Sequence, residues 1–319
     1  MSTNTDLIDI HADDYALTVH TSEDMLALMK DGILDSISIV PNNSCYSDCM
    51  DMLKSCIPTL PFLPKLSVHL NLVEGKRLSS NDGSLISSTW KHLFTDSYDP
   101  FQKRMAKERI KAEISAQIQK AQEDINDCIQ LAKEHNIPCS QTGLRIDSHQ
   151  HTHMIPVVWD ALTEYLYEAG HDVEYIRNSK EPLWPFLSTP ALWSTYRPVN
   201  IIKNRLLSLF SKKADRYDRL NGHKQMYLWG LVMSGKMDRS RIAELFPLLA
   251  KKAEGDGRVL EILFHPGRMR EDEMNSEIPV DAAGSFYLSP NRDIEKNGAI
   301  FCRGLNIPEQ SDPVQNRPK

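Results

Sequence analysis

The sequence predicts an α/β protein whose mainly parallel sheet is either open or closed as a barrel. Two kinds of pattern alternate along the chain. One is a short run in which apolar and polar residues alternate, as in a strand, and the other is a longer helical pattern. The length of 319 residues is sufficient for one large α/β domain or two modest ones. Hydrophobic residues make up 41% and charged residues 25% of the chain, as in ordinary globular proteins, which excludes general disorder.

The N-terminal third alternates predicted strands with predicted helices. An apolar run ends at Asp13-Asp14, and a capping signal around Thr21 begins a helix that Gly32 closes. The predicted elements are a strand over residues 7–12, a helix over 21–32, a strand over 33–40, a helix over 46–55, a strand over 66–72 and a loop over about 75–100.

The clearest helical pattern covers residues 101–136. Its apolar residues recur at steps of three or four, which places them on one face of a helix. These residues are Ile110, Ile114, Ile118, Ala121, Ile125 and Ile129. The remaining predicted elements are strands over 142–147, 173–177, 227–232 and 258–264, and helices over 156–169 and 238–253. Strands that alternate with helices imply parallel pairing.

Residues 178–225 interrupt this alternation. The segment holds four prolines, two tryptophans and a cluster of basic residues. The cluster comprises Lys203, Arg205, Lys212, Lys213, Arg216 and Arg219. We expect a surface excursion, because long insertions are tolerated there; a lid or a homodimer contact is the alternative. One domain is expected over residues 1–307, followed by a disordered tail over 308–319.

Composition and charge exclude several classes of protein. The net charge of −6 and the pI of about 6.0 argue against a nucleic-acid partner and against a polybasic membrane binder. The N-terminus lacks the pattern of a signal peptide, and no apolar run reaches the length of a membrane span. The six cysteines show no C-x-x-C spacing and are expected to be reduced. These observations together predict a cytoplasmic protein without a membrane partner.

Polar residues occupy one face of several predicted strands. His69 alternates with leucine and valine in one strand, and Glu261 and His265 share a face of the last strand. In parallel barrels, catalytic residues lie at the C-terminal ends of strands, where Asp13-Asp14, His69 and His265 are found. Each of these signals has an ordinary alternative: a turn and helix cap for the two aspartates, a hydrogen-bonded core histidine for His69 and a tight turn for His265.

The run from Asp147 to His153 is the most specific signal. It places His149, His151 and His153 at alternate positions next to an acid. Imidazole and carboxylate groups are the usual ligands of a catalytic divalent ion. We therefore predict a metal-binding or catalytic role for this run.

Four segments together resemble the YdjC-like family, which includes chitooligosaccharide (diacetylchitobiose) deacetylases. They are Asp13-Asp14-Tyr15, His69-Leu70-Asn71-Leu72, Asp147-Ser148-His149-Gln150-His151-Thr152-His153-Met154 and His265-Pro266-Gly267. The resemblance extends from residue 7 to about 295. It implies a distorted (β/α) barrel, similar to a TIM barrel, with the segment around 178–225 as an excursion from a single domain.

The resemblance also implies roles for individual residues. Asp14, His69 and His149 would hold a divalent metal, magnesium in most descriptions of the family, with zinc as the alternative. Asp13 would be the general base. His265, which corresponds to the C-terminal histidine of the family, is the catalytic group expected to protonate the leaving amine. Five further groups are expected to contact the substrate or a metal ligand, namely His151, His153, Arg145, Arg177 and Glu261. For the two arginines, a solvated surface position is the alternative.

The chain departs from the family pattern at three places. Ala16 replaces a usual glycine, Gln150 replaces a common third consecutive histidine, and residues 183–223 are longer and more basic than usual. The predicted function is a metal-dependent hydrolase that removes an N-acetyl group from a small acetylated amino sugar or chito-oligosaccharide and releases acetate. The alternatives are a phosphoesterase or other amidohydrolase on the same barrel, and a sugar-binding protein without catalysis.

Overall fold

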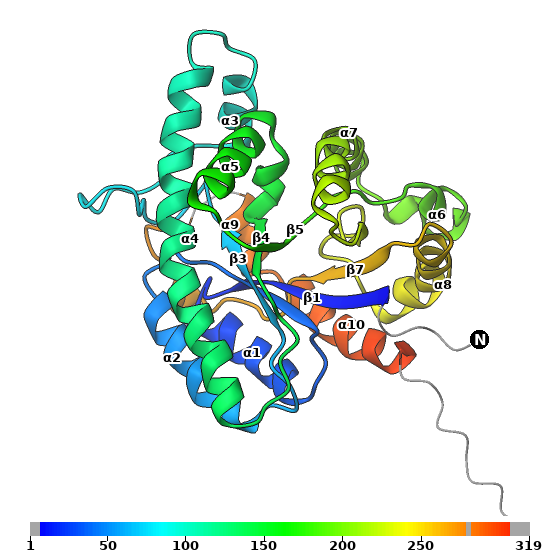
Figure 1. Cartoon of the computed structure of the whole chain (residues 1–319). Coiled ribbons are helices and arrows are strands. Elements are labelled where there is room, and N and C mark those ends of the chain that lie inside the picture. Colours follow the sequence, from blue (N-terminus) through cyan, green and yellow to red (C-terminus); the bar gives the residue numbers. More distant parts are fainter. Residues whose placement is uncertain (1–6, 279–281, 307–319) are drawn as a thin grey trace, which may run out of the picture.

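A computed structural model describes residues 7–278 and 282–306 (Figure 1). Seven strands form one sheet in which every pairing is parallel, in the order β5-β4-β3-β2-β1-β7-β6. The strands are β1 (Ile8–Tyr15), β2 (Ser36–Ile39), β3 (Lys65–Leu70), β4 (Leu144–Ser148), β5 (Val173–Ile176), β6 (Met226–Trp229) and β7 (Val259–Phe264). The predicted α/β class and all seven predicted strands are confirmed. The tail expected over 308–319 lies outside the described residues.

Helices flank the sheet and connect its strands (Figure 1). They are α1 (Val19–Lys30), α2 (Tyr46–Cys56), α3 (Trp90–Asp96), α4 (Lys103–Glu134), α5 (Pro156–Ala169), α6 (Trp184–Leu187), α7 (Pro198–Asn221), α8 (Arg239–Gly255), α9 (Ala282–Tyr287) and α10 (Asn291–Asn306). Short 3₁₀ turns are η2 (Ile57–Thr59), η3 (His149–Met154), η4 (Pro190–Thr195) and η5 (Glu271–Glu273). No helix of the described ranges is both long and apolar enough to cross a membrane.

The sheet curls so that its two edge strands approach each other. Glu261 on β7 bonds to the Tyr175 hydroxyl on β5, and Arg177, just after β5, donates to Glu261 across 2.7 Å. The Leu228 amide on β6 also donates to the Lys180 carbonyl at 3.0 Å. No strand ladder joins β5 to β6 within the described residues. The result is a distorted barrel that this gap leaves partly open.

Buried polar side chains fill the interior of this barrel. They alternate along the strands with apolar residues that face the helices, which explains the polar face predicted from the sequence. The interior set includes Asp9, His11 and Asp13 of β1, Ser36 and Ser38 of β2, Arg145 and Asp147 of β4 and Glu261 of β7. Because buried polar groups need partners, these side chains form one hydrogen-bonded network that fixes their orientations.

Helix α4 covers the sheet with the apolar stripe that the sequence predicts. Ile114, Ile118 and Ala121 are fully buried in the main core. The predicted loop over 75–100 contains helix α3, which the sequence analysis missed. Seven residues are too few for an apolar period to show, and the Thr89 side chain, which accepts from the His92 amide, begins the helix instead.

Residues 178–225 are mostly helical rather than irregular. Helix α7 begins with Pro198, whose missing amide costs nothing at that position, and ends before Gly222 at φ 72°. Leu207 and Ala214 pack its inner face into the main core. The excursion is therefore a long helix held against the barrel.

Candidate metal and catalytic site

Two adjacent aspartates at the end of β1 reach the same side of the sheet. Successive side chains of a regular strand point to opposite faces. Asp14, however, has a φ of 74°, and the pairing of β1 with β2 shifts between Ala12 and Tyr15. As a result, Asp13 Oδ1 lies 4.0 Å and Asp14 Oδ1 3.5 Å from nitrogens of the His69 ring. Ala16 also has a positive φ, of 64°, which is consistent with glycine at this position in the family.

The three predicted metal ligands converge. Asp14, His69 and His149 are buried and offer ligand atoms that all lie within 4.8 Å of one another. Asp14 Oδ1 is 3.3 Å from His149 Nδ1, and His69 Nε2 is a buried nitrogen without a hydrogen-bond partner. One carboxylate and two imidazoles with an unsatisfied nitrogen fit a divalent cation such as zinc, manganese or cobalt, and a magnesium site with fewer oxygen ligands than usual.

Another polar group bonds to each of the three predicted ligands. His69 Nδ1 lies 2.6 Å from Asp147 Oδ1, which leaves Nε2 directed at the site. His149 Nε2 lies 2.9 Å from the Tyr287 hydroxyl. Arg292 Nη1 donates to Asp14 Oδ2 at 2.8 Å from a fully buried position. Such outer contacts orient metal ligands and tune their basicity.

Of these supporting residues, only Asp147 belongs to a segment for which the sequence predicts a role in the site. Asp147 stands in the motif that identified the site, and its place directly before the histidines was a usable signal. Glu74, which accepts from the Tyr287 hydroxyl at 2.6 Å, and Arg292 come from other segments of the chain. Nothing in their local sequence points to the site.

The structure corrects the expectation that His151 or His153 orients a metal ligand. His153 bonds to Ser148 Oγ at 2.6 Å and to the Arg177 carbonyl at 2.8 Å, and burial lowers its pKa to about 4. His151 Nδ1 bonds to Ser179 Oγ at 3.0 Å. Neither ring bonds to Asp14, His69 or His149. Asp147 and Tyr287 have the orienting position instead.

Arg177 is fully buried at the centre of the polar interior, which excludes the solvated alternative. Its guanidinium donates to both oxygens of Asp13 at 2.8 Å and lies 3.2 Å from Asp147 and 2.7 Å from Glu261. Burial alone would raise the pKa of Asp13, but Arg177 and His69 outweigh it and hold that pKa well below its usual range. His11, Asp13 and Asp147 form a second group of possible ligands, and Arg177 already neutralises its carboxylates.

Arg145 lies at the other end of the barrel, so its expected contact with substrate is wrong. It follows the start of β4, donates to Glu174 at 2.8 Å and stacks on the Tyr175 ring at 4.2 Å. It lines a separate cavity at the N-terminal ends of the strands, together with Asp9. Parallel barrels carry their chemistry at the opposite end.

His265, directly after β7, is paired with a buried glutamate of α10. Glu295 accepts from the His265 amide at 2.6 Å and lies 3.1 Å from its Nδ1. Burial lowers the pKa of His265, whereas Glu295 raises it, and the net shift is upward. No motif in the sequence around Glu295 predicts this pairing.

A cavity of about 350 Å³ opens over these groups. Its walls include Asp13, Asp14, His149, His151 and His265, together with Tyr287, Arg197 directly before α7, and Asn200 and Lys203 of α7. Burial lowers the pKa of Lys203 to about 8. The excursion therefore supplies one wall of the site, a role that its cluster of basic residues did not by itself reveal.

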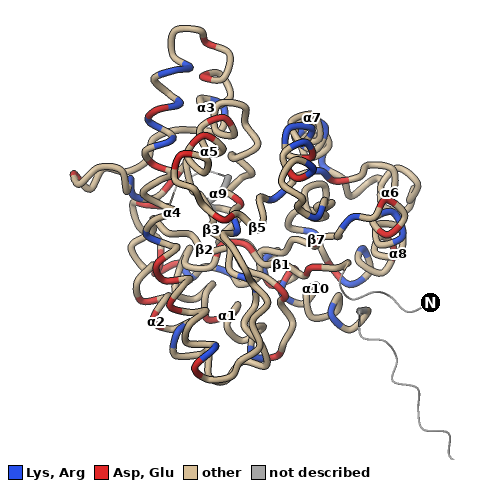
Figure 2. The backbone as a smooth tube through the Cα atoms, in the orientation of Figure 1, with Lys and Arg blue, Asp and Glu red and all other residues tan. Residues whose placement is uncertain are grey.

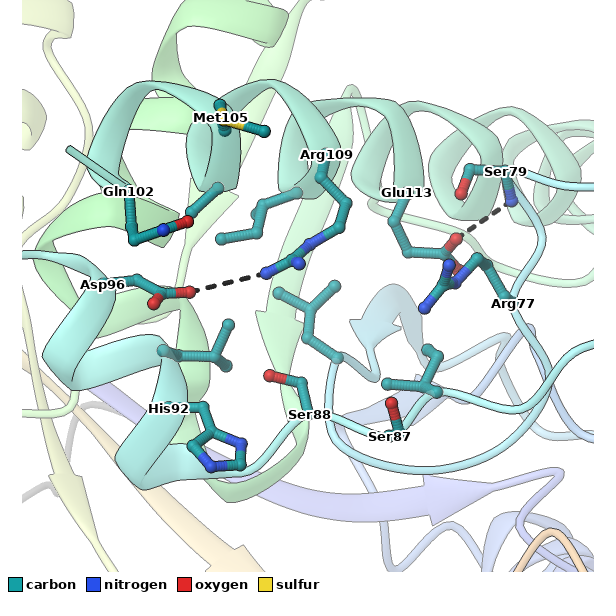
Figure 3. A pocket seen from close by; sticks show the side chains of 15 residues that line it. Arg77, Ser79, Ser87, Ser88, His92, Asp96, Gln102, Met105, Arg109 and Glu113 are labelled. Atoms are coloured by element: carbon teal, nitrogen blue, oxygen red, sulfur yellow. Dashed lines mark hydrogen bonds and ion pairs between the residues drawn. The ribbon is translucent and has the colours of Figure 1, made fainter.

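A second cavity, of about 530 Å³, lies between the loop after β3 and helices α3 and α4 (Figure 3). Arg109 there pairs with Asp96 at 3.4 Å, and Glu113 accepts from the Ser79 amide at 2.9 Å. This second cavity is larger than the first, but none of the predicted ligands or catalytic groups lines it. The predicted catalytic groups Asp13 and His265 line the smaller cavity instead.

The chain is similar to a known family, to a named relative and to solved structures. The model of a family described as "YdjC-like protein" matches residues 7–127 and 141–297. A protein of Oceanobacillus iheyensis named "Carbohydrate deacetylase" is 26% identical over 170 residues, which are 52% of this chain and 62% of that protein. A crystal structure of a putative cellobiose-phosphate cleavage protein from Enterococcus faecalis aligns over 93% of this chain and 94% of its own, at 15% identity and a TM-score of 0.46.

Proposed function

The chain belongs to the YdjC-like family, and on that premise we propose that it is a metal-dependent hydrolase that removes an N-acetyl group from an acetylated amino sugar or chito-oligosaccharide. The observation that supports this proposal most strongly is the convergence of Asp14, His69 and His149 on one buried point beside Asp13. The similarity of half of the chain to a carbohydrate deacetylase agrees with it.

Asp14, His69 and His149 would hold the divalent ion. A bound ion would polarise the acetamide carbonyl and lower the pKa of a coordinated water. Magnesium is the ion that the family resemblance favours, whereas the two imidazole nitrogens favour zinc, cobalt or manganese. Asp147 and Tyr287 would hold the rings of His69 and His149 in the ligating orientation.

Asp13 and His265 would carry the two proton transfers. Asp13, kept ionised and fixed in orientation by Arg177, would accept a proton from the attacking water. His265, whose protonated form Glu295 favours, would donate a proton to the departing amine. The water oxygen bonds to the carbonyl carbon, the C–N bond breaks, and acetate and a free amino sugar leave.

The cavity suits a small sugar. Its volume lies within the range usual for small-molecule sites. Arg197, Asn200 and Lys203 add polar groups that could bond to sugar hydroxyls. The two cations of this wall also favour a phosphoesterase as the second candidate, because they could bind a phosphate group of the substrate.

Mass spectrometry of acetylated chito-oligosaccharides tests the proposal. The protein would be stripped with a chelator and then supplied with Mg²⁺, Zn²⁺ or Co²⁺ in separate reactions. We expect loss of one acetyl group and release of acetate with at least one metal, and no reaction with Asp14→Asn. Release of phosphate from sugar phosphates, without acetate from any acetylated sugar, would favour the phosphoesterase.

A further inference from the structure

The outer side of α7 carries one continuous stripe of exposed residues. They follow one another at steps of three or four, so they lie in a row along the helix. The row comprises Val199, Ile202, Arg205, Leu209, Lys212, Arg216 and Leu220. At 24 residues, the helix is about 36 Å long. Apolar and cationic side chains thus share one face of a long helix.

The cations of this stripe lack acidic partners. Within the described part of the chain, Arg205, Lys212 and Arg216 form no ion pair, and neither does the neighbouring Arg219. Both acids of α7, Asp215 and Asp218, are buried. Figure 2 shows blue segments gathered on α7, whereas both signs alternate along α4. A chain with a net charge of −6 therefore presents a local positive face.

The apolar side chains of the stripe are unusually exposed. Ile202 exposes 68% and Leu220 75% of its surface, and Leu209 exposes more than half. Exposed apolar surface of this extent marks an interaction site.

We propose that the outer face of α7 docks on a membrane surface of anionic phospholipid. Lys and Arg beside Leu and Ile, on a helix without exposed acids, are the composition of helices that lie in a bilayer interface. The phosphates of a nucleic acid would pair with the cations, but they would not account for the exposed apolar side chains of Ile202 and Leu209. Lys203 of the same helix and Arg197 directly before it line the site cavity, so docking would bring that cavity close to the lipid surface.

This proposal departs from the expectation of no membrane partner, which rests on the net charge of the whole chain. Exposed charges act within a Debye length, about 8 Å at physiological salt. Attraction to an anionic surface therefore depends on the cations of this face and not on the net charge of the whole chain. The described ranges contain no helix that could cross a membrane, but a protein can bind to a membrane surface without a membrane-crossing helix.

Vesicle sedimentation with the full chain tests the proposal without any substrate. We expect the wild-type protein to sediment with vesicles that combine phosphatidylcholine and phosphatidylglycerol, but not with vesicles of phosphatidylcholine alone. Added salt should release the bound protein. The double substitution Lys212→Glu and Arg216→Glu should weaken this binding by about 30-fold or more, since each cation near an anionic surface contributes about 1 kcal/mol. Ile202→Ser with Leu209→Ser should weaken it as well.

The matched control is Lys30→Glu with Lys133→Glu, which changes the net charge equally at exposed positions of α1 and α4. It should bind as the wild type does, and melting temperatures should show that all variants are folded. The proposal is overturned if the wild type does not sediment at low salt, or if the control loses as much binding as the α7 variant. Binding of a DNA duplex without vesicle binding, or a dimer abolished by the serine substitutions without vesicle binding, would also overturn it.

Discussion

Glu295 binds His265 twice, through the backbone amide at 2.6 Å and through Nδ1 of the ring at 3.1 Å. The carboxylate is fully buried. It therefore fixes both the backbone position and the ring orientation of the proposed general acid. It also favours the protonated ring, because the positive charge would otherwise be buried without a partner.

Glu295→Gln should change the pH dependence of the reaction. His265 must be protonated to donate, so activity is lost as the pH rises through its pKa. The raised pKa in the wild type moves this loss to higher pH, and the neutral amide should move it back to lower pH. The measurement is kcat against pH. Glu123→Gln, at an exposed position of α4, is the control and should leave the profile unchanged. An unchanged profile for Glu295→Gln would exclude the proposed role of His265.

Asp13→Asn and Asp14→Asn should separate metal binding from proton transfer. Asp14→Asn should weaken metal affinity and turnover together, and it should lose the rise in melting temperature that metal gives the wild type. Asp13→Asn should still bind metal, while kcat falls by about 10² to 10⁴, the usual contribution of a positioned general base. Calorimetric titration with metal and kinetics on both variants decide the assignment. An Asp13→Asn protein with a rate near that of the wild type would reject the mechanism.

Asp147→Asn should weaken metal binding although Asp147 is not a ligand. The amide cannot replace the carboxylate that holds the His69 ring at 2.6 Å, so the ring becomes less basic and less fixed. We expect a loss of about 10- to 100-fold in metal affinity, measured by titration. Asp51→Asn, exposed on α2, is the control and should bind metal normally. Equal affinities of wild type and Asp147→Asn would show that this contact does not tune the ligand.

Arg177→Met should destabilise the fold strongly. The substitution leaves the carboxylates of Asp13, Asp147 and Glu261 without the cation that they share. Removal of one partner from a buried ion pair costs about 3–5 kcal/mol of unfolding free energy. Urea denaturation measures this loss. Arg219→Met, on the exposed side of α7, should change the unfolding free energy by less than about 0.5 kcal/mol. A similar small change for Arg177→Met would mean that water replaces the guanidinium.

The local pattern of the sequence determines most of the elements. A period of two places His69 on the polar face of β3, and steps of three and four place Ile114 and Ile118 on the buried face of α4. Such patterns depend only on neighbours along the chain, so they can be recognised without a structure. The short helix α3 could not be predicted in this way, because it has too few residues to show a helical period of apolar residues.

The supporting shell of the site depends on the tertiary structure. Tyr287, Arg292 and Glu295 lie far along the chain from the residues they hold, and no local pattern distinguishes them from ordinary helical residues. Only the packing of α9 and α10 against the ends of the strands brings them into contact.

The sequence by itself determined that an aspartate pair and a row of histidines follow buried strands. It did not determine that Asp13 and Asp14 act on one side, because regular strand geometry separates adjacent side chains, and the left-handed backbone at Asp14 overrides that rule. Nor did it distinguish Arg177 from Arg145. Arg177 follows the end of its strand, whereas Arg145 follows the start. A parallel barrel places these positions at opposite ends, so Arg177 lies beside the predicted metal ligands and Arg145 lies far from them.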